Sequence, residues 1–318
     1  MKPEVTRRRA LAVLAGLGLA AGGARAAASA SVLEWRGTAL GADATLVFAN
    51  ADRQRAEQAL AACLAEINRL ERIFSLYLET SEISRLNRHG HLNQPSFDMQ
   101  VLLSQALMMH QASEGLFDPT VQAIWEFRRD LAARGSDANE ALPTSVLAKV
   151  GLGKITIDPE EVVLPQGVSI SLNGIAQGYI TDRVADILRR RGWKDVLIDL
   201  GETRALEGRP FDVLIRESGR KISITNGALA TSSSAPLAVG ARGELPHLFD
   251  PRSGLAASRV WSAVTVMHAS AAHADALSTA LMACGGEDTR LVRRIMSRFA
   301  SARAWITRPG RDDLVIAT

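Results

Sequence analysis

The sequence predicts an α+β fold organised as one domain. Segments whose apolar residues alternate, as in strands, are interleaved with segments whose apolar residues recur at helical spacing, without the regular strand–helix–strand order of a doubly wound sheet. No Pro- or Ser-rich linker divides the chain. Its 318 residues, of which 47% are hydrophobic and 22% charged, suffice for one large globular domain.

Residues 1–26 are predicted to be an export signal rather than part of this domain. An arginine run at 7–9 precedes an apolar stretch at 10–21, which is too short to span a bilayer comfortably. Ala-Arg-Ala at 24–26 then matches a signal-peptidase site, and a buried Ala-rich helix is the alternative. The arginines resemble a twin-arginine signal, although Sec signals can look alike. We expect residues 27–318 to form a periplasmic domain, without stable membrane insertion after signal removal.

The net charge argues against a nucleic-acid partner. Residues 1–26 carry five basic residues and one acidic residue, while the whole chain has a formal net charge of +3. The chain beyond residue 26 therefore has a net charge of about −1. Nucleic-acid binding depends on a basic surface, so this class of function loses its electrostatic support.

The first half of the domain is predicted as a hairpin followed by helices. Residues 35–48 have the pattern of a strand or hairpin, and residues 52–73 that of a long helix with Asp52 placed to cap it. Further along, the patterns indicate turns at 74–87, helices at 100–113, 123–130 and 145–150, and a hairpin from 155–157 and 161–164.

The second half is predicted to be mainly strands. A helix at 178–191 and a buried strand at 196–200 come first. The remaining predicted strands are 211–215, 221–225, 228–231, 261–267 and 302–306, interrupted by one helix at 274–284.

Residues 171–179 form the first of three segments that suggest chemistry. The chain has no Walker loop, Rossmann fingerprint, His-Glu-x-x-His or Cys-x-x-Cys. Small residues in this segment allow close backbone approach, and Gly178 is expected to open a helix whose N-terminus favours phosphate. The alternative is a tight strand-to-helix turn without a ligand.

Two further segments carry polar residues at suggestive spacings. Residues 247–254 place a His, an Asp and an Arg in one turn, which packing alone does not require, although a polar surface turn is the alternative. Asp275 and Thr279 are four residues apart, so their oxygens share one helix face and suit Mg²⁺. Alternatively, Asp275 is only an acid stabilised by the helix dipole.

Taken together, these segments resemble the ApbE-type FAD:protein FMN transferases. The resemblance runs from about residue 40 to residue 287, and its pieces follow the family's order. They are residues 74–77 and 81–87 around a flavin-stacking tyrosine, Phe-Asp-Pro-Thr-Val at 117–121, the turn at 174–178, Gly201 and Glu202, residues 230–232, and the segments at 247–254 and 274–279.

The resemblance implies a reaction and a set of site residues. FMN would pass from FAD, the substrate, to a Thr or Ser hydroxyl of an acceptor protein, with Mg²⁺ as cofactor and AMP as product. Asp275, Thr279 and the Gly174 carbonyl would hold Mg²⁺, and His247 would act as base beside Asp275, because an unperturbed histidine side chain titrates near neutral pH. The FAD site would contain Leu40, Tyr77, Leu116, Phe117, Asp118, Ser171, Gln177, Thr231, Ser232 and Phe249.

The family resemblance also implies an ApbE-like domain of mixed or antiparallel sheets with packed helices. It further implies an acceptor with an FMN-binding domain of a membrane electron-transfer system. Two residues depart from the family pattern, because Ser171 and Gln177 stand where an Asp and a Lys are usual. The variant at 173–178 resembles the branch that accompanies nitrous-oxide reduction. An FAD pyrophosphatase, which forms FMN and AMP, and a periplasmic flavin-binding protein without turnover stay open as alternatives.

Overall fold

The described part of the chain contains the whole predicted domain apart from short gaps. The structure, a computed structural model, describes residues 11–13, 32–134, 141–235, 237–238, 244–257, 260–286 and 288–318. The predicted signal peptide lies outside these residues except for strand β1 (Leu11–Val13), which pairs with β9 (Phe211–Ile215). Export therefore stays a prediction.

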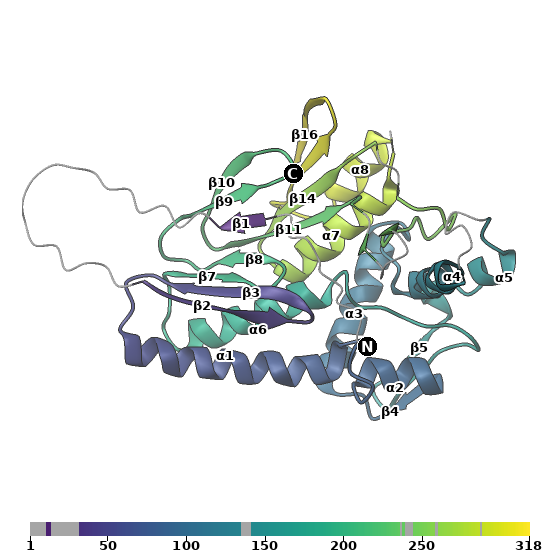
Figure 1. Ribbon diagram of the computed structural model, residues 1–318, viewed down its shortest axis with the longest axis horizontal. Helices are drawn as coiled ribbons and strands as arrows, with labels where there is room; N and C mark the ends of the chain where they lie inside the picture. Colours follow the sequence, from purple (N-terminus) through teal and green to yellow (C-terminus); the bar gives the residue numbers. More distant parts are fainter. Residues whose placement is uncertain are drawn as a thin grey trace, which may run out of the picture.

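An eight-stranded sheet forms the centre of the domain (Figure 1). All neighbouring strands in it run antiparallel, which confirms the predicted α+β class. In sheet order, the strands are β16 (Arg311–Ala317), β15 (Arg303–Arg308), β14 (Ala263–His268), β11 (Gly227–Ser233), β8 (Thr203–Ala205), β7 (Val196–Asp199), β3 (Ala42–Phe48) and β2 (Leu33–Ala39).

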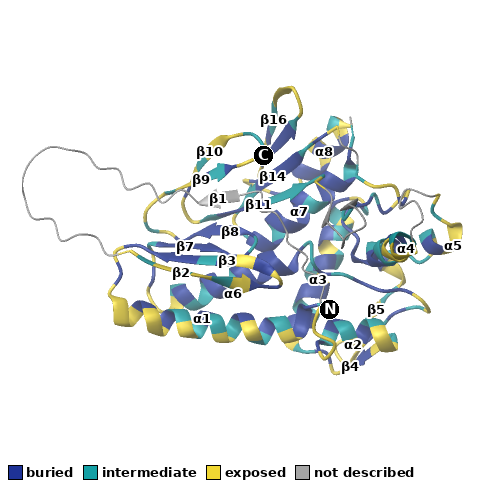
Figure 2. Cartoon of the chain, viewed as in Figure 1, coloured by how far each residue is buried: buried dark blue, intermediate teal, exposed yellow. Residues whose placement is uncertain are grey.

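Three helices form a layer on one face of this sheet. Helix α7 (Ala271–Cys284) lies on β11 and β14, α6 (Ala176–Arg190) packs against α7, and α1 (Arg53–Phe74) packs against α6. Eleven of the 14 residues of α7 are buried, and the main hydrophobic core lies around it (Figure 2). None of the described helices is long and apolar enough to cross a membrane.

The opposite face of the sheet is covered by a small sheet of β1, β9 and β10 (Arg220–Ile224). A second hydrophobic cluster joins the two sheets, with Val213 and Ile224 from the small sheet packed near Val47 and Trp305. Because successive side chains in a strand point to opposite faces, β3, β7, β11, β14 and β15 contribute to both clusters. Ala230, for example, faces α7, while Leu229 faces the small sheet.

The remaining elements surround the end of the domain that carries α3 (Phe97–Ala112). They are α2 (Glu82–His89), α4 (Gln122–Ala133), α5 (Thr144–Leu147), α8 (Thr289–Met296), the 3-10 helices η1 (Pro119–Val121) and η2 (Leu152–Lys154), the small sheet of β4 (His91–Asn93), β6 (Glu161–Val163) and β5 (Thr156–Ile157), and the pair β12 (Leu237–Ala238) and β13 (Glu244–Leu245).

Several predicted elements differ from the observed ones at their ends. Asp52 caps α1 as expected, because its side chain accepts the amide of Arg55 at 2.8 Å. The predicted turns at 74–87 were wrong in part, since α2 occupies residues 82–89. Helix α6 begins at Ala176, so Gly178 lies within its first turn instead of opening it. Helix α7 begins three residues earlier than predicted, after the cap residue Ser270.

Candidate active site

The first turns of α6 and α7 cross in direct contact. A Cβ added at Gly178 would lie 2.3 Å from the carbonyl oxygen of Ala271, so only glycine allows this approach. The Gly178 amide donates a hydrogen bond of 3.2 Å to Oδ2 of Asp275, which is 4% exposed. The phosphate site predicted at this helix N-terminus is therefore wrong in one respect, because this amide binds a carboxylate of the protein itself.

Two of the predicted metal ligands meet directly beside this crossing. Gly174 lies in the turn before α6, and a Cβ added there would lie 3.0 Å from the hydroxyl oxygen of Thr279. The ring of Phe117 closes the other side of the same glycine, at 3.4 Å from that Cβ position. Thr279 and Asp275 are one helical turn apart on α7. The structure thus brings Gly174, Thr279 and Asp275 into one region.

This region fits a hard cation in its donor chemistry. It offers one carboxylate, one hydroxyl and one backbone carbonyl, which are oxygen donors of the kind that Mg²⁺ accepts alongside water and phosphate. The described residues contain no group of three or more His, Cys, Asp or Glu side chains that could hold a metal. A metal at this site would therefore depend on the neutral oxygens as well as on Asp275.

Ser232 belongs to this region and Thr231 does not. The hydroxyl of Ser232, on β11, lies 2.9 Å from that of Ser278 and 3.4 Å from that of Thr279. Thr231, the preceding residue, hydrogen-bonds the hydroxyl of Thr265 at 2.8 Å on the neighbouring strand. The side chains of adjacent strand residues point to opposite faces, so of the two residues predicted to contact the phosphate region only Ser232 lies beside Thr279.

Gln177 is buried under the turn between β7 and β8. Its side chain is 5% exposed, and a Cβ added at Gly201 would lie 2.4 Å from its Nε2. Gly201 also has a φ of 102°, a left-handed conformation that favours glycine. The side chain that replaces the family lysine therefore packs against this turn.

The segment Leu116–Asp118 acts as a framework for the site. Leu116 and Phe117 are buried, and the carboxylate of Asp118 accepts the amides of Thr120 at 2.9 Å and Leu152 at 3.1 Å. Ser171 is tied to the same segment, because its amide donates to the carbonyl of Pro119 at 2.9 Å. Asp118 therefore holds the backbone that presents Phe117.

Leu40, Gly41 and Tyr77 form a second wall of predicted site residues, at the turn between β2 and β3. Leu40 and Gly41 make the two-residue turn between β2 and β3, with φ values of 47° and 75°. The Leu40 amide donates to Oε1 of Glu71 at 2.6 Å, and a Cβ added at Gly41 would lie 3.5 Å from the Tyr77 ring. Tyr77 is 58% exposed, so its ring is accessible for stacking.

His247 and Phe249 lie in the loop that follows β13. Phe249 is buried with Ile124 and pairs with Ala256 across the loop, while His247 is half-buried. The other two polar residues noted in this segment, Asp250 and Arg252, form an ion pair with each other at 2.8 Å. His247 is the residue of this segment whose side chain could accept a proton.

Sequence reasoning missed the residues that fix the start of α7. Asp182, on α6, accepts the amides of Ala271 at 2.9 Å and Ala272 at 3.2 Å and pairs with Arg204. His268 and His273 lie close by, and burial lowers the pKa of both imidazoles. A cavity of about 340 Å³ is lined by these residues together with Asp186, Ala269 and Ser270. The only sequence signal was an aspartate four residues after Gly178.

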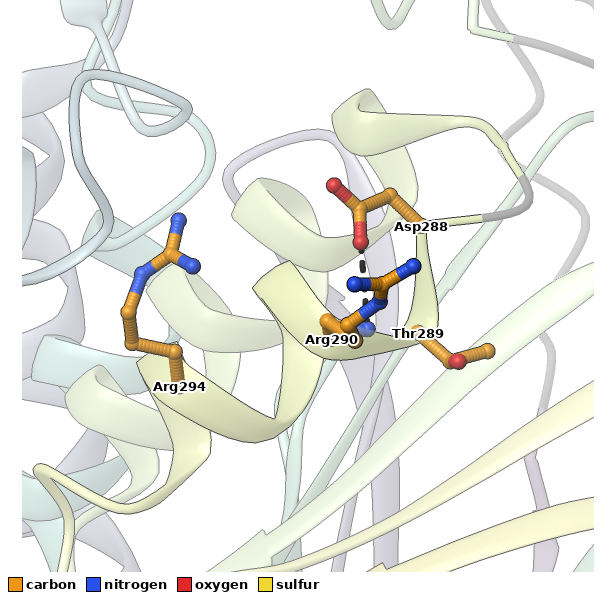
Figure 3. A pocket seen from close by; sticks show the side chains of 4 residues that line it. All are labelled: Asp288, Thr289, Arg290 and Arg294. Atoms are coloured by element: carbon orange, nitrogen blue, oxygen red, sulfur yellow. Dashed lines mark hydrogen bonds between the residues drawn. The ribbon is translucent and has the colours of Figure 1, made fainter.

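A larger hollow, at the start of α8, lies apart from these groups. It measures about 500 Å³ and is lined by Asp288, Thr289, Arg290 and Arg294 (Figure 3). Asp288 caps the helix by accepting the amides of Arg290 and Leu291, and Arg294 pairs with Glu114 at 2.7 Å. Asp288 and Arg294 therefore have structural roles. The hollow is lined by none of the predicted site residues.

Comparison with known sequences gives one family. Residues 37–300 match the ApbE family. A protein of Haemophilus influenzae named FAD:protein FMN transferase is 28% identical over 267 residues, which cover 76% of this chain and 75% of that protein. A protein of Vibrio cholerae with the same name is 27% identical over 233 residues, covering 67% of this chain and 69% of the relative.

Solved structures share the fold. The ApbE protein of Thermotoga maritima superposes with a TM-score of 0.76 at 24% identity, covering 91% of this chain and 97% of that one. The apo form of the Pseudomonas stutzeri flavinyl transferase ApbE gives a TM-score of 0.72, also at 24% identity, over 91% of this chain and 95% of that one. The family match extends over most of the sequence, and the chain belongs to the ApbE family.

Proposed function

We propose that this protein transfers FMN from FAD to a Thr or Ser hydroxyl of another protein and releases AMP, using Mg²⁺. The names of its relatives support flavin transfer. The observation that carries the finer proposal is the meeting of Gly174, Asp275 and Thr279 where α6 crosses α7. These residues supply a carboxylate, a hydroxyl and a backbone carbonyl, which are oxygen donors suited to a metal ion that binds a pyrophosphate.

The proposed reaction is a substitution at phosphorus. The oxygen of the acceptor hydroxyl forms a bond to the phosphorus on the FMN side of the pyrophosphate, and the bond to the bridging oxygen breaks. AMP leaves with that oxygen, and the hydroxyl proton passes to Nε2 or Nδ1 of His247. A bound Mg²⁺ would supply charge stabilisation for the phosphate oxygens. Asp275, Thr279 and the Gly174 carbonyl would hold it.

The rest of the chain would bind and orient FAD. The exposed ring of Tyr77 would stack on an aromatic part of the substrate, beside the Leu40–Gly41 turn. Phe117 would pack beside Gly174, and Phe249 would line the side formed by the loop after β13. Ser232 would contact the phosphates, since its hydroxyl lies near that of Thr279. Correct placement of the reacting groups supplies much of the rate in such a transfer.

The acceptor we propose is an exported protein with an FMN-binding domain of a membrane electron-transfer system. This proposal depends on the predicted export signal at residues 1–26 and on the family resemblance. Export itself can be tested by intact-mass analysis of the native protein. A mature protein that begins near residue 27 and is found outside the cytoplasm would support it, and a retained Met1 in a cytosolic fraction would contradict it.

The decisive experiment is an incubation of residues 27–318 with FAD, Mg²⁺ and a candidate acceptor domain. We expect a fluorescent flavin band on the acceptor in a denaturing gel and one AMP for each flavin attached. The control is the same acceptor with its hydroxyl residue changed to Ala or Val, which should stay dark. Release of FMN and AMP without labelling would indicate a pyrophosphatase. Tight FAD binding without either product would indicate a flavin-binding protein.

A further inference from the structure

We propose that Asp182 is a positioning residue that fixes α7 on α6 and thereby aims Asp275 at the metal site. The metal in this inference rests on the proposed function, whereas the contacts between the helices are observed in the structure. Asp182 is on α6, one turn after Gly178, and none of the segments that suggested chemistry includes it.

The two helices are joined by two hydrogen bonds of the same kind, in each of which a carboxylate of one helix accepts a backbone amide of the other. Each helix has a small residue in its first turn and an aspartate four residues later: Gly178 and Asp182 on α6, Ala271 and Asp275 on α7. The Ala271 amide donates to Oδ1 of Asp182 at 2.9 Å. In return, the Gly178 amide donates to Oδ2 of Asp275 at 3.2 Å. Each carboxylate therefore binds the first turn of the other helix.

Electrostatics favours this arrangement. The N-terminus of a helix carries a partial positive charge from its unpaired amides, and here two such ends lie in contact. Asp182 accepts a second amide, that of Ala272, and so offsets part of the charge at the start of α7. Without Asp182, the two positive helix ends would repel each other, and Asp275 would be the remaining carboxylate that joins the two first turns.

Asp182 is itself held rigidly. Its Oδ2 accepts the hydroxyl of Ser270 at 2.7 Å, and Ser270 is the cap residue of α7. Arg204, on β8, forms an ion pair with it from the sheet below. The start of α7 is thus connected to both α6 and the sheet through one carboxylate.

A helix transmits this constraint to the metal ligands. Asp275 lies one turn beyond Ala271, and Thr279 one turn beyond Asp275, so each step along α7 is about 6 Å. Ligand oxygens must lie within a few tenths of an ångström of their ideal distance from Mg²⁺. A small movement of the first turn therefore weakens metal binding without removing a ligand.

The test compares Asp182→Asn with a matched control, Asp186→Asn. Asp186 is one turn further along α6 and lines the same cavity, but it pairs with Arg189 at 3.5 Å and, within the described residues, bonds no amide of α7. Titration of the apoprotein with Mn²⁺, followed by electron paramagnetic resonance, measures metal binding without turnover. We expect about 10-fold weaker Mn²⁺ binding for Asp182→Asn and none of this loss for Asp186→Asn.

Kinetics separate a positioning role from a general loss of stability. For Asp182→Asn, the Mg²⁺ concentration at half-saturation should rise by about 10-fold, while the turnover number at saturating Mg²⁺ returns close to the wild-type value. Ser270→Ala should shift both measurements in the same direction by less, and it decides the question if Asp182→Asn does not fold. A folded Asp182→Asn protein with wild-type metal binding and wild-type Mg²⁺ dependence would overturn the inference.

Amide exchange tests the coupling between the two helices independently of the proposed function. In Asp182→Asn, the Gly178 amide should exchange faster in nuclear magnetic resonance spectra, although Asp182 does not bond that amide. An unchanged Gly178 exchange rate would refute the coupling even if the wild-type protein transfers FMN. Faster exchange together with weaker Mn²⁺ binding would support it even if the wild-type protein labels no acceptor, in which case only the proposed function fails.

Discussion

The crossing of α6 and α7 and the wall around Tyr77 are built in opposite ways. At the crossing, Asp275 is 4% exposed and hydrogen-bonded by Gly178, and backbone approaches backbone so closely that a single methyl group does not fit. At the wall, Tyr77 is 58% exposed and its ring lies beside the Leu40–Gly41 turn. The region proposed for chemistry is therefore preorganised, and the region proposed for ring binding is open.

This difference separates two kinds of binding energy. Groups that are fixed before the substrate arrives can act on the transition state at no cost of reorganisation. An exposed aromatic ring contributes mainly to ground-state affinity, because it binds substrate and transition state alike. We therefore expect changes to the proposed metal ligands at the crossing to affect the turnover number and changes at the wall to affect the Michaelis constant.

The largest effect should come from Asp275→Asn. Losing the charged ligand removes several kcal/mol of transition-state stabilisation, so turnover should fall by roughly 1,000-fold. AMP release from FAD in the presence of acceptor, across a Mg²⁺ titration, measures the effect. Thr279→Val should act in the same direction but less, since a neutral ligand is lost. Near-normal turnover of Asp275→Asn at low Mg²⁺ would show that the proposed metal site is wrong.

Gly178→Ala tests the close contact at the crossing. The added Cβ would lie 2.3 Å from the carbonyl of Ala271, so the helices must separate, and we expect a loss of about 1–3 kcal/mol in unfolding free energy. Turnover should fall with it. Gly153→Ala is the control, because its Cβ would have nothing within 4 Å, and its stability should change by less than about 0.5 kcal/mol. Equal stabilities for the two variants would contradict the packing described here.

Tyr77→Ala should weaken FAD binding by about 1–3 kcal/mol and leave stability nearly unchanged, by analogy with stacking of bases on aromatic side chains. Calorimetric titration with FAD measures the change, and Tyr77→Phe, which keeps the ring, should bind almost as the wild type does. If Tyr77→Ala lowers the turnover number at saturating FAD instead, the wall takes part in chemistry and the comparison between the two regions fails.

The smallest effect concerns pH at the start of α7. Burial lowers the pKa of His268 and His273, and Nδ1 of His268 accepts the amide of Ser270 at 2.9 Å, so folding favours the neutral rings. Between the lowered folded pKa values and the ordinary value of about 6.5, the unfolded chain binds more protons. Stability should therefore be complete above about pH 6.5 and decline as the pH falls below it. Urea unfolding at pH 7.5 and 5.5 should show a smaller decline for the double variant His268→Gln, His273→Gln.

The sequence was sufficient to predict most helices and strands, and to predict proximity between residues that are close to each other along the chain. Helix α1 was predictable because its apolar residues follow helical spacing and Asp52 caps it locally. The proximity of Asp275 and Thr279 follows from one turn of helix. Helix α2 was missed because it is short and mostly polar, so turn-forming residues dominate its pattern.

What the sequence could not provide depends on contacts between distant residues. Asp182 and Ala271 are 89 positions apart, and no local pattern indicates that they bond. The separation of Thr231 from Ser232 follows from which face of β11 meets α7, and that face is known only once the sheet is assembled. The meeting of Gly174 with Thr279 came from the family resemblance, since the two lie in different elements.

The burial of α7 also limits which amino-acid substitutions this helix can accept. Eleven of its 14 residues are buried, many of them alanines packed between α6 and the sheet, so nearly every position lacks room for a larger side chain. Helix α1 has seven buried residues among 22, all on one side. In a library of random variants selected for function, α1 should therefore accept changes with a helical period, whereas α7 should remain almost constant throughout its length.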